Sequence, residues 1–155
     1  MIASSQEDTK LIANKLAKDI KGTNVTICLN GDLGSGKTTF SRYLIRSLLP
    51  SRVKDDIPSP TFTLLQIYDE KERSIYHYDF YRLNKIEELI ELNYSESILN
   101  NICIIEWANK FKKALPSNRI DINFEIKPKN TRLIKFNLIG TYKKQDYLWM
   151  KEKSF

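Results

Sequence analysis

Cysteine and histidine, the side chains that most often bind transition metals, are scarce in this sequence. It has two cysteines, Cys28 and Cys103, and one histidine, His77, among 155 residues. No cysteine pair has the spacing of zinc ligands, so a zinc site is not expected. Each cysteine lies within a short apolar run, which is typical of a thiol buried in a strand, and we expect the two strands to be neighbours.

Long hydrophobic runs are also absent. No apolar run approaches the roughly 18 residues that a membrane-spanning helix requires, and residues 1–10 lack the charged start and apolar stretch of a secretory signal. With 41% hydrophobic and 28% charged residues, the composition is that of a soluble globular protein. We therefore expect a cytoplasmic protein with no membrane partner, folded as one domain over residues 1–155. For the peripheral tail, residues 141–155, an edge element, a docking segment and a frayed end all stay open.

Acidic residues are fewer than basic ones, 19 against 25, so the formal net charge is +6. The basic residues are spread along the chain and are not gathered in one block. Such a balance is typical of a protein that binds nucleic acid or an acidic partner surface. It is equally typical of a lysine-rich composition without such a role, and both interpretations remain open.

Glycine is rare, with five residues in the whole chain, yet three of them fall within residues 31–38. This segment reads G-D-L-G-S-G-K-T, the complete G-x-x-x-x-G-K-[ST] pattern of a phosphate-binding loop. Glycines allow the backbone to curl so that its N–H groups point inward toward phosphate oxygens. Lys37 supplies a positive charge for the β- and γ-phosphates, and the Thr38 hydroxyl is suited to coordinate Mg²⁺.

The segments around the loop support this interpretation. Residues 25–29 are β-branched and apolar, as in a buried parallel strand, and residues 39–49 carry apolar side chains at helical spacing until Pro50 ends the helix. A helix that starts at the loop adds its partial positive charge to the phosphate site. The pattern therefore predicts a protein that binds a nucleoside triphosphate. The alternative, a glycine-rich turn that binds nothing, is not favoured.

The rest of the chain alternates between helical and strand patterns. Helices are predicted over residues 7–20, 85–92, 96–99 and 108–115, with Asn93 as a left-handed terminator, and strands over residues 61–68, 74–80, 102–105, 119–126 and 133–138. The first two and the last two of these strands are expected to pair as hairpins. We expect an α/β fold of the P-loop NTPase type: three layers, with a mostly parallel central sheet and antiparallel hairpin additions.

Two acidic residues are candidates for the metal side of such a site. Glu106 directly follows the apolar residues 102–105, and Asp79 lies at the end of another predicted strand. P-loop proteins use an acidic residue near the phosphates to hold Mg²⁺ or its water. For each carboxylate, the alternatives are a helix cap or a pair with a lysine.

The roles of three further features cannot be decided from the residues alone. His77, in the strand that leads to Asp79, is more typical of a packed, hydrogen-bonded histidine than of a catalytic one. Arg82 is placed to pair with Asp79 or Glu106, or to reach phosphate. Residues 58–63, with two prolines, form either a turn that enters the strand or a segment that passes over the γ-phosphate.

Four motifs follow one another along the chain: G-D-L-G-S-G-K-T-T at residues 31–39, S-P-T-F-T-L at 59–64, H-Y-D-F-Y-R-L at 77–83 and I-E-W at 105–107. In order and spacing they resemble the TsaE family, also called YjeE, over about residues 5–138. The loop alone is shared by many NTPases, whereas the three motifs that follow it are much more specific.

The resemblance implies a role for each matching residue. Contacts to the nucleotide are implied for Gly34, Ser35, Gly36, Lys37, Thr38, Thr39, Thr61 and Arg132. Thr61 would belong to a nucleotide-sensing segment, and Arg132 matches the arginine that opens the family's last strand. Mg²⁺ coordination is implied for Thr38 and Glu106. Lys37, Asp79 and Glu106 would be the catalytic residues, with Asp79 orienting the metal-bound or attacking water.

The resemblance also implies what the protein does. TsaE proteins are ATP-binding, Mg²⁺-dependent ATPases needed to form threonylcarbamoyladenosine at adenosine 37 of tRNAs that read ANN codons. They act with two other proteins, TsaB and TsaD, and any contact with tRNA would be made through that complex. The chain would then be a single P-loop ATPase domain. The alternative is a small-molecule P-loop kinase, although only scattered arginines follow the loop helix.

Overall fold

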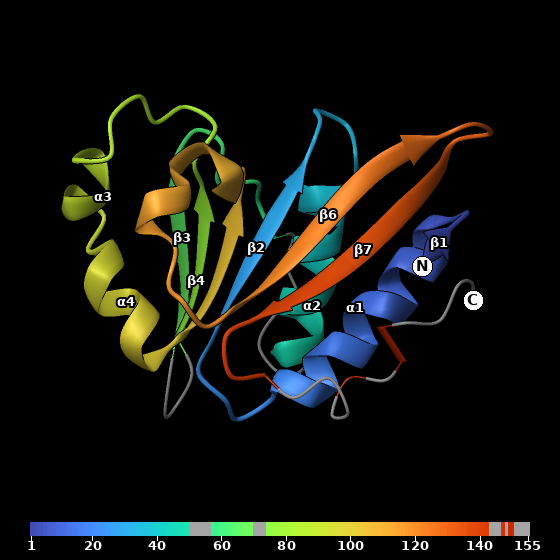
Figure 1. Cartoon of the computed structure of the whole chain (residues 1–155), viewed down its shortest axis with the longest axis horizontal. Coiled ribbons are helices and arrows are strands. Elements are labelled where there is room, and N and C mark those ends of the chain that lie inside the picture. Colours follow the sequence, from blue (N-terminus) through green and yellow to red (C-terminus); the bar gives the residue numbers. More distant parts are fainter. Residues whose placement is uncertain (50–56, 70–73, 143–146, 148, 151–155) are drawn as a thin grey trace.

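The computed structural model describes residues 1–49, 57–69, 74–142, 147, 149 and 150, and its core is a single sheet (Figure 1). The strands of this sheet are β1 (Ile2–Ala3), β2 (Val25–Gly31), β3 (Leu65–Asp69), β4 (Ser74–Asp79), β5 (Ile102–Glu106), β6 (Arg119–Lys127) and β7 (Thr131–Ile139). The helices are α1 (Gln6–Ile20), α2 (Lys37–Leu48), α3 (Glu88–Glu91), α4 (Tyr94–Asn100) and the 3₁₀-helix η1 (Ala108–Ala114).

The four central strands of the sheet are parallel. The strand order is β1-β7-β6-β2-β5-β4-β3, in which β6, β2, β5 and β4 pair in parallel, and β1, β7 and β3 join the two sides in antiparallel fashion. This confirms the predicted parallel centre and both predicted hairpins. Because parallel strands end at the same edge, the last residues of β2, β4 and β5 meet at the upper edge of the sheet in Figure 1.

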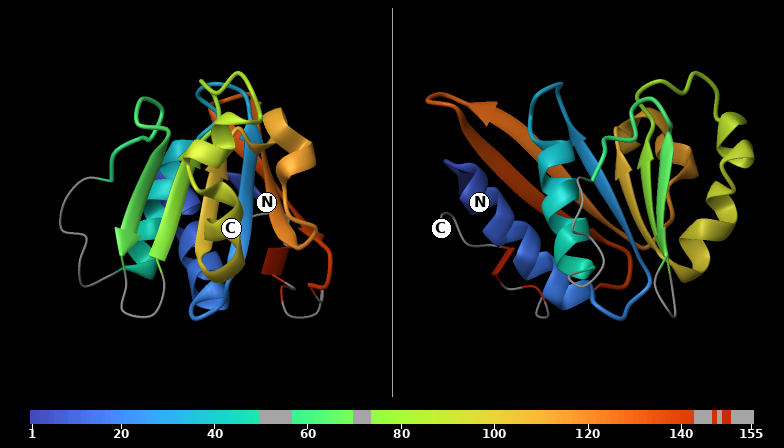
Figure 2. Two further views of the ribbon diagram at one scale, coloured as in Figure 1. Left: turned by 90° about the vertical axis from the view of Figure 1, so that its left-hand side faces the viewer. Right: turned by 180° about the vertical axis from the view of Figure 1, so that it is seen from behind.

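Helices cover both faces of the sheet and make three layers (Figure 2). Along β2, Ile27 and Leu29 face the layer of α1 and α2, whereas Cys28 between them faces α4 and η1. The side-chain period of a strand is two residues, so a strand that is buried on both faces, such as β2 or β5, supplies both cores. The three-layer arrangement that the sequence predicts is confirmed.

The core below α2 contains an aromatic pair that we expect to be important for stability. Phe40 on α2 is fully buried, and its ring lies edge-on to that of Phe124 on β6, with 5.5 Å between centroids. Phe40→Ala is expected to lower the free energy of unfolding by about 3–5 kcal/mol, because it removes the ring and leaves a cavity. Urea denaturation would measure this loss.

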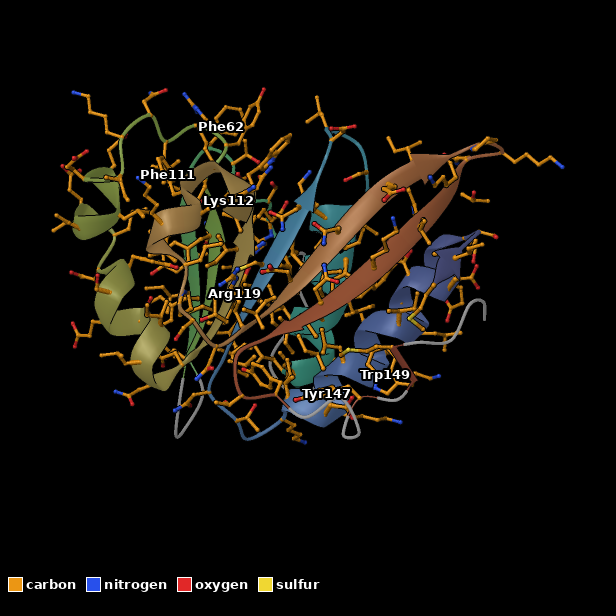
Figure 3. All side chains as sticks on the ribbon, viewed as in Figure 1. Phe62, Phe111, Lys112, Arg119, Tyr147 and Trp149 are labelled. Carbon is orange, nitrogen blue, oxygen red and sulfur yellow. The ribbon has the colours of Figure 1, made fainter. Side chains whose placement is uncertain are left out.

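Phe62→Ala is the matched control for that experiment. Phe62 is 84% exposed and projects from the loop before β3 (Figure 3), so the same chemical change should alter the free energy of unfolding by no more than about 0.5 kcal/mol. Equal losses in the two variants would contradict the described packing of Phe40.

The two cysteines lie on neighbouring strands, as predicted. Cys28 on β2 and Cys103 on β5 are free thiols, fully buried in the core below α4. Burial raises the pKa of the Cys103 thiol to about 12, and burial together with the nearby Asp121 raises the pKa of Cys28 further. Both are therefore packing residues in the reduced state.

One strand prediction is wrong at its start. Residues 61–64 form a turn, closed by a 2.6 Å bond from the Leu64 N–H to the Pro60 carbonyl, and β3 begins only at Leu65. Leu64 itself has a positive φ of 65°. The apolar and β-branched composition of this segment favours a strand, but its Leu64 N–H is bonded within the turn and its Thr61 hydroxyl bonds to Asp79.

The helices on the α4 side of the sheet differ from their predicted bounds: α3 is shorter than predicted, whereas α4 (Tyr94–Asn100) is longer than the predicted 96–99. The helix expected over residues 85–92 is limited to α3, and Asn93 adopts the predicted left-handed conformation (φ 50°), after which α4 begins. The segment 108–115 is a 3₁₀-helix interrupted at Phe111 (φ −126°, ψ 57°). The two-residue strand β1, which pairs with β7, was not predicted, because so short a segment carries no periodicity.

The described part of the C-terminal tail packs against the body of the protein. The indole N–H of Trp149 donates to Asp19 of α1 at 2.6 Å, and its ring lies 5.4 Å from that of Phe136 on β7; Figure 3 shows Tyr147 and Trp149 beside α1. The predicted helix stop at Pro50 and part of the turn after β3 lie outside the described residues. No helix within the described ranges is long and apolar enough to cross a membrane.

Candidate functional site

The glycine-rich loop joins the end of β2 to the start of α2, at the sheet edge where the parallel strands end. Gly31 has φ 147°, and a side-chain Cβ there would lie 2.5 Å from the Phe124 carbonyl oxygen, so only glycine fits. Gly36, with φ 106°, turns the chain into α2, which begins at Lys37. The first N–H groups of a helix have no partner within it, so the start of α2 provides donors and a partial positive charge for an anion.

The lysine of the loop is almost buried, with 4% of its surface exposed. Its Nζ donates to the carbonyl oxygens of Gly31 (2.7 Å) and Asp32 (2.9 Å), and it lies 3.9 Å from the centroid of the Trp107 ring. Burial lowers the pKa of the Lys37 ammonium, and the carboxylates of Glu106, Asp79 and Asp32 oppose that shift. The ammonium bonds to neutral carbonyls, so its charge is available for phosphate oxygens.

Glu106 lies beside the first turn of α2 and is 1% exposed. Its Oε2 accepts a 2.7 Å hydrogen bond from the Thr38 hydroxyl. Its Oε1 accepts from the Ser41 hydroxyl at 3.2 Å and lies 2.9 Å from His77 Nε2. One carboxylate thereby links the last residue of β5 to α2 and to β4.

Asp79 is the register partner of Glu106 at the end of the neighbouring strand and is 2% exposed. Its Oδ2 accepts from the Thr61 hydroxyl at 2.7 Å, and its Oδ1 accepts from the Tyr81 backbone N–H at 2.8 Å. Thr61 in turn lies 2.8 Å from the Ser59 hydroxyl. The segment 58–63 is therefore a turn, as one of the two alternatives predicts, and it brings Thr61 to the second acid.

Among the hollows that touch the loop, two share Gly34, Gly36 and Thr39 in their walls. The first is further lined by Leu33, Lys37, Thr38, Thr61, Asp79, Tyr81, Glu106 and Trp107. The second is further lined by residues at the start of α1, by Ser35, by Phe124 of β6, by Arg132 and Ile134 of β7, and by Asn130 in the turn between these strands. A nucleotide whose phosphates lie on the loop would extend into both hollows.

Arg132, predicted to lie near the nucleotide, is beside the loop: its Nη2 donates to the Gly34 carbonyl at 3.3 Å. Ser35 has a buried hydroxyl without a hydrogen-bond partner among the described residues, and it lines the second hollow. Arg82 makes neither of the carboxylate pairs considered for it; its guanidinium lies 5.1 Å from the Phe62 ring. The structure thus brings every predicted site residue except Arg82 to the loop or to the hollows beside it.

Two contacts in this site were not predicted. Ser41 bonds to Glu106. Ser41 follows Lys37 by four residues on α2, and this helical spacing puts both side chains on one face of the helix, so the sequence could have indicated that Ser41 lies near the site. His77 also contacts Glu106, and it is two residues before Asp79 on the same face of β4. The strand period could have placed His77 on the side of the acids, but only the pairing of β4 with β5 shows that it reaches Glu106.

The donor set fits a magnesium nucleotide. A hydroxyl and a carboxylate oxygen 2.7 Å apart, Thr38 Oγ1 and Glu106 Oε2, are hard oxygen ligands of the kind that Mg²⁺ takes alongside phosphate and water. The lysine and the start of α2 supply positive charge for the phosphates, and Asp79 supplies a second acceptor within the same hollow.

The parallel sheet, the glycine-rich loop at its carboxyl edge, the buried lysine and the two acids at adjacent strand ends define a P-loop protein of the α/β class. A family model described as "Threonylcarbamoyl adenosine biosynthesis protein TsaE" matches residues 3–134. The chain belongs to the TsaE family, which confirms the resemblance found in its motifs.

Individual relatives agree with this assignment. The chain is 41% identical to the tRNA threonylcarbamoyladenosine biosynthesis protein TsaE of Rickettsia felis, over 86% of this chain and 76% of that protein. It is 34% identical to the protein of the same name from Bacillus subtilis, over 86% and 82%. The crystal structure of Bacillus subtilis YdiB matches with a TM-score of 0.72 and 27% identity, over 97% of this chain and 91% of that one.

Proposed function

We propose that the protein binds ATP with Mg²⁺, hydrolyses it, and serves as the ATPase subunit in the formation of threonylcarbamoyladenosine on tRNA. The observation that carries this proposal is the 2.7 Å contact between Thr38 and Glu106 beside the buried Lys37. This contact places a hydroxyl and a carboxylate, which are suited to hold Mg²⁺, next to the lysine that is suited to hold phosphate. The names of the relatives support the tRNA-modification role.

The two hollows suggest which way the nucleotide lies. The P-loop lysine contacts the β- and γ-phosphates, and the acids lie on the side of the first hollow. The γ-phosphate therefore belongs in the first hollow and the nucleoside in the second, between the start of α1 and Arg132. The exposed polar groups of this second hollow, among them Asn130 and Arg132, are suited to a nucleoside.

Each site residue then has a defined part in hydrolysis. Lys37 and the first N–H groups of α2 hold the phosphates and stabilise the charge that grows on their oxygens as the bond between the γ-phosphorus and the bridging oxygen breaks. Thr38 and Glu106 would hold Mg²⁺, which neutralises phosphate charge when bound. Asp79 would accept a hydrogen bond from the attacking water and orient its oxygen toward the γ-phosphorus. Thr61, bonded to Asp79, would change partners when the γ-phosphate arrives or leaves.

A small-molecule kinase is the less favoured function. Such enzymes usually cover the phosphates with several arginines. In the described residues after α2, Arg82 stacks on Phe62, and Arg119 pairs with Asp121 at 2.9 Å. Arg132 alone of these three reaches the loop. The arrangement therefore favours water over a second substrate as the phosphoryl acceptor.

The proposed partners are the proteins TsaB and TsaD, and the net charge of +6 suits an acidic partner surface or tRNA held by that complex. ATP hydrolysis by the purified protein is expected to be slow alone and several-fold faster when both partners are added. Phosphate release with and without the partners would measure this, with Lys37→Ala as the background. No change in rate on adding both partners would contradict the proposal, and faster phosphoryl transfer to a metabolite than to water would favour the kinase.

A further inference from the structure

The two oxygens of Glu106 have different surroundings. Oε2 faces Thr38, the residue with which it would share Mg²⁺. Oε1 lies on the other side, 2.9 Å from His77 Nε2 and 3.2 Å from the Ser41 hydroxyl. A carboxylate offers only acceptors, so His77 Nε2–H donates to Oε1. The single proton of the Ser41 hydroxyl is shared between Oε1 at 3.2 Å and the Lys37 backbone carbonyl at 3.0 Å.

The side chain of His77 has no other described hydrogen bond. The ring is fully buried, and its second nitrogen, Nδ1, has no hydrogen-bond partner among the described residues. Burial of an imidazole costs free energy that an apolar side chain such as the nearby Ile75 does not incur. A histidine present only for packing would gain nothing from this position, whereas a donor to Glu106 would.

We propose that His77, together with Ser41, is a positioning residue for Glu106. The two side chains hold Oε1 from β4 and α2, so that Oε2 points to Thr38 and toward the metal before Mg²⁺ and nucleotide enter. Partners of this kind orient a metal-binding side chain, and removing one typically costs about 10-fold to 100-fold in metal affinity or activity. This inference rests on the proposed function, since it assigns His77 to the magnesium side of that site.

The test compares nucleotide binding with and without metal. The dissociation constant of a fluorescent, non-hydrolysable ATP analogue is measured in Mg²⁺ and in EDTA, and the ratio of the two gives the gain from the metal. His77→Leu is expected to reduce this gain about 10-fold to 100-fold and to leave the affinity in EDTA unchanged. His77→Gln, whose amide can still donate toward Oε1, is expected to restore most of the gain.

Tyr78→Phe is the matched control. Tyr78 neighbours His77 on β4 but faces the other core, where its hydroxyl bonds to Ser97 and to the Leu92 carbonyl. This variant removes a buried hydrogen bond from the same strand and should leave the metal-dependent gain unchanged. It therefore distinguishes a loss of stability in β4 from a loss of metal positioning.

The possible outcomes distinguish failure of the positioning role of His77 from failure of the proposed Mg²⁺-dependent nucleotide binding. If the wild-type protein gains no affinity from Mg²⁺, the proposed function is wrong. If the wild type gains affinity and His77→Leu gains as much, or if Tyr78→Phe loses as much as His77→Leu, the positioning role alone is wrong. Should His77→Leu fail to fold, Ser41→Ala decides, because it removes the other donor to Oε1, and an unchanged gain from Mg²⁺ would overturn the inference.

Discussion

Replacing Lys37 by alanine is expected to lower the rate of ATP hydrolysis by about 100-fold to 1,000-fold. The ammonium lies inside the loop, bonded to the Gly31 and Asp32 carbonyls and almost out of contact with water. A charge in such a place acts on phosphate oxygens with little screening, and it needs no rearrangement of solvent when charge develops in the transition state. The initial rate of phosphate release at saturating ATP and Mg²⁺ would measure the loss.

Lys112→Ala is the matched control for Lys37→Ala. Lys112 is exposed on η1 (Figure 3) and lines neither hollow beside the loop. Loss of one positive charge there should leave hydrolysis nearly unchanged. If Lys37→Ala retained most of the wild-type rate, the loop would not be the site of the reaction.

The second large effect is expected from Glu106→Gln, which should reduce hydrolysis by at least about 100-fold and abolish most of the affinity gained from Mg²⁺. Glutamine keeps the size of the side chain, but it is neutral and replaces one oxygen by an NH₂ group. That group cannot accept from Thr38 on one side, or from Ser41 and His77 on the other. Titration of nucleotide binding against Mg²⁺ would separate this loss from a loss of ATP affinity.

Glu125→Gln provides the comparison at an exposed carboxylate. Glu125 pairs with Lys127 and Lys135 on the hairpin of β6 and β7, and these hydrogen bonds lower its pKa to about 2. Glu125 does not line the hollow that contains Asp79 and Glu106, so hydrolysis and Mg²⁺ dependence should be retained. Similar losses of hydrolysis in Glu106→Gln and Glu125→Gln would mean that these carboxylates act through the overall charge of the protein and not through contacts in the site.

Much of the fold could be predicted because its signals are local. Residues 25–29 and 102–105 are largely apolar, which indicated strands buried on both faces, and α1 and α2 carry apolar residues at helical spacing. The errors came where tertiary contacts override local composition. Residues 61–64 have the composition of a strand, yet they form a turn in which Thr61 bonds to Asp79.

In the candidate site, too, the local features could be predicted from the sequence, whereas the contacts between distant residues could not. The loop could be predicted in full, because each residue acts through its own backbone or side chain within eight consecutive positions. The two acids could be identified as candidates from their places at strand ends. The sequence could not distinguish whether Arg82 or His77 would reach them, because contact between β4 and β5 depends on strand order and register.

The chain by itself determined the chemistry of this protein: a glycine-rich cradle, a lysine, a hydroxyl and two carboxylates, all encoded in short motifs that local backbone preferences turn into a loop and strand ends. Only the tertiary structure decided that Glu106 meets Thr38, that Thr61 meets Asp79, and that His77 and Ser41 share one oxygen of Glu106. The physical reason is distance along the chain. Thr38 and Glu106 are 68 residues apart, and no local preference acts over such a separation. Pairing of parallel strands, driven by burial of both faces of the sheet, brings them together.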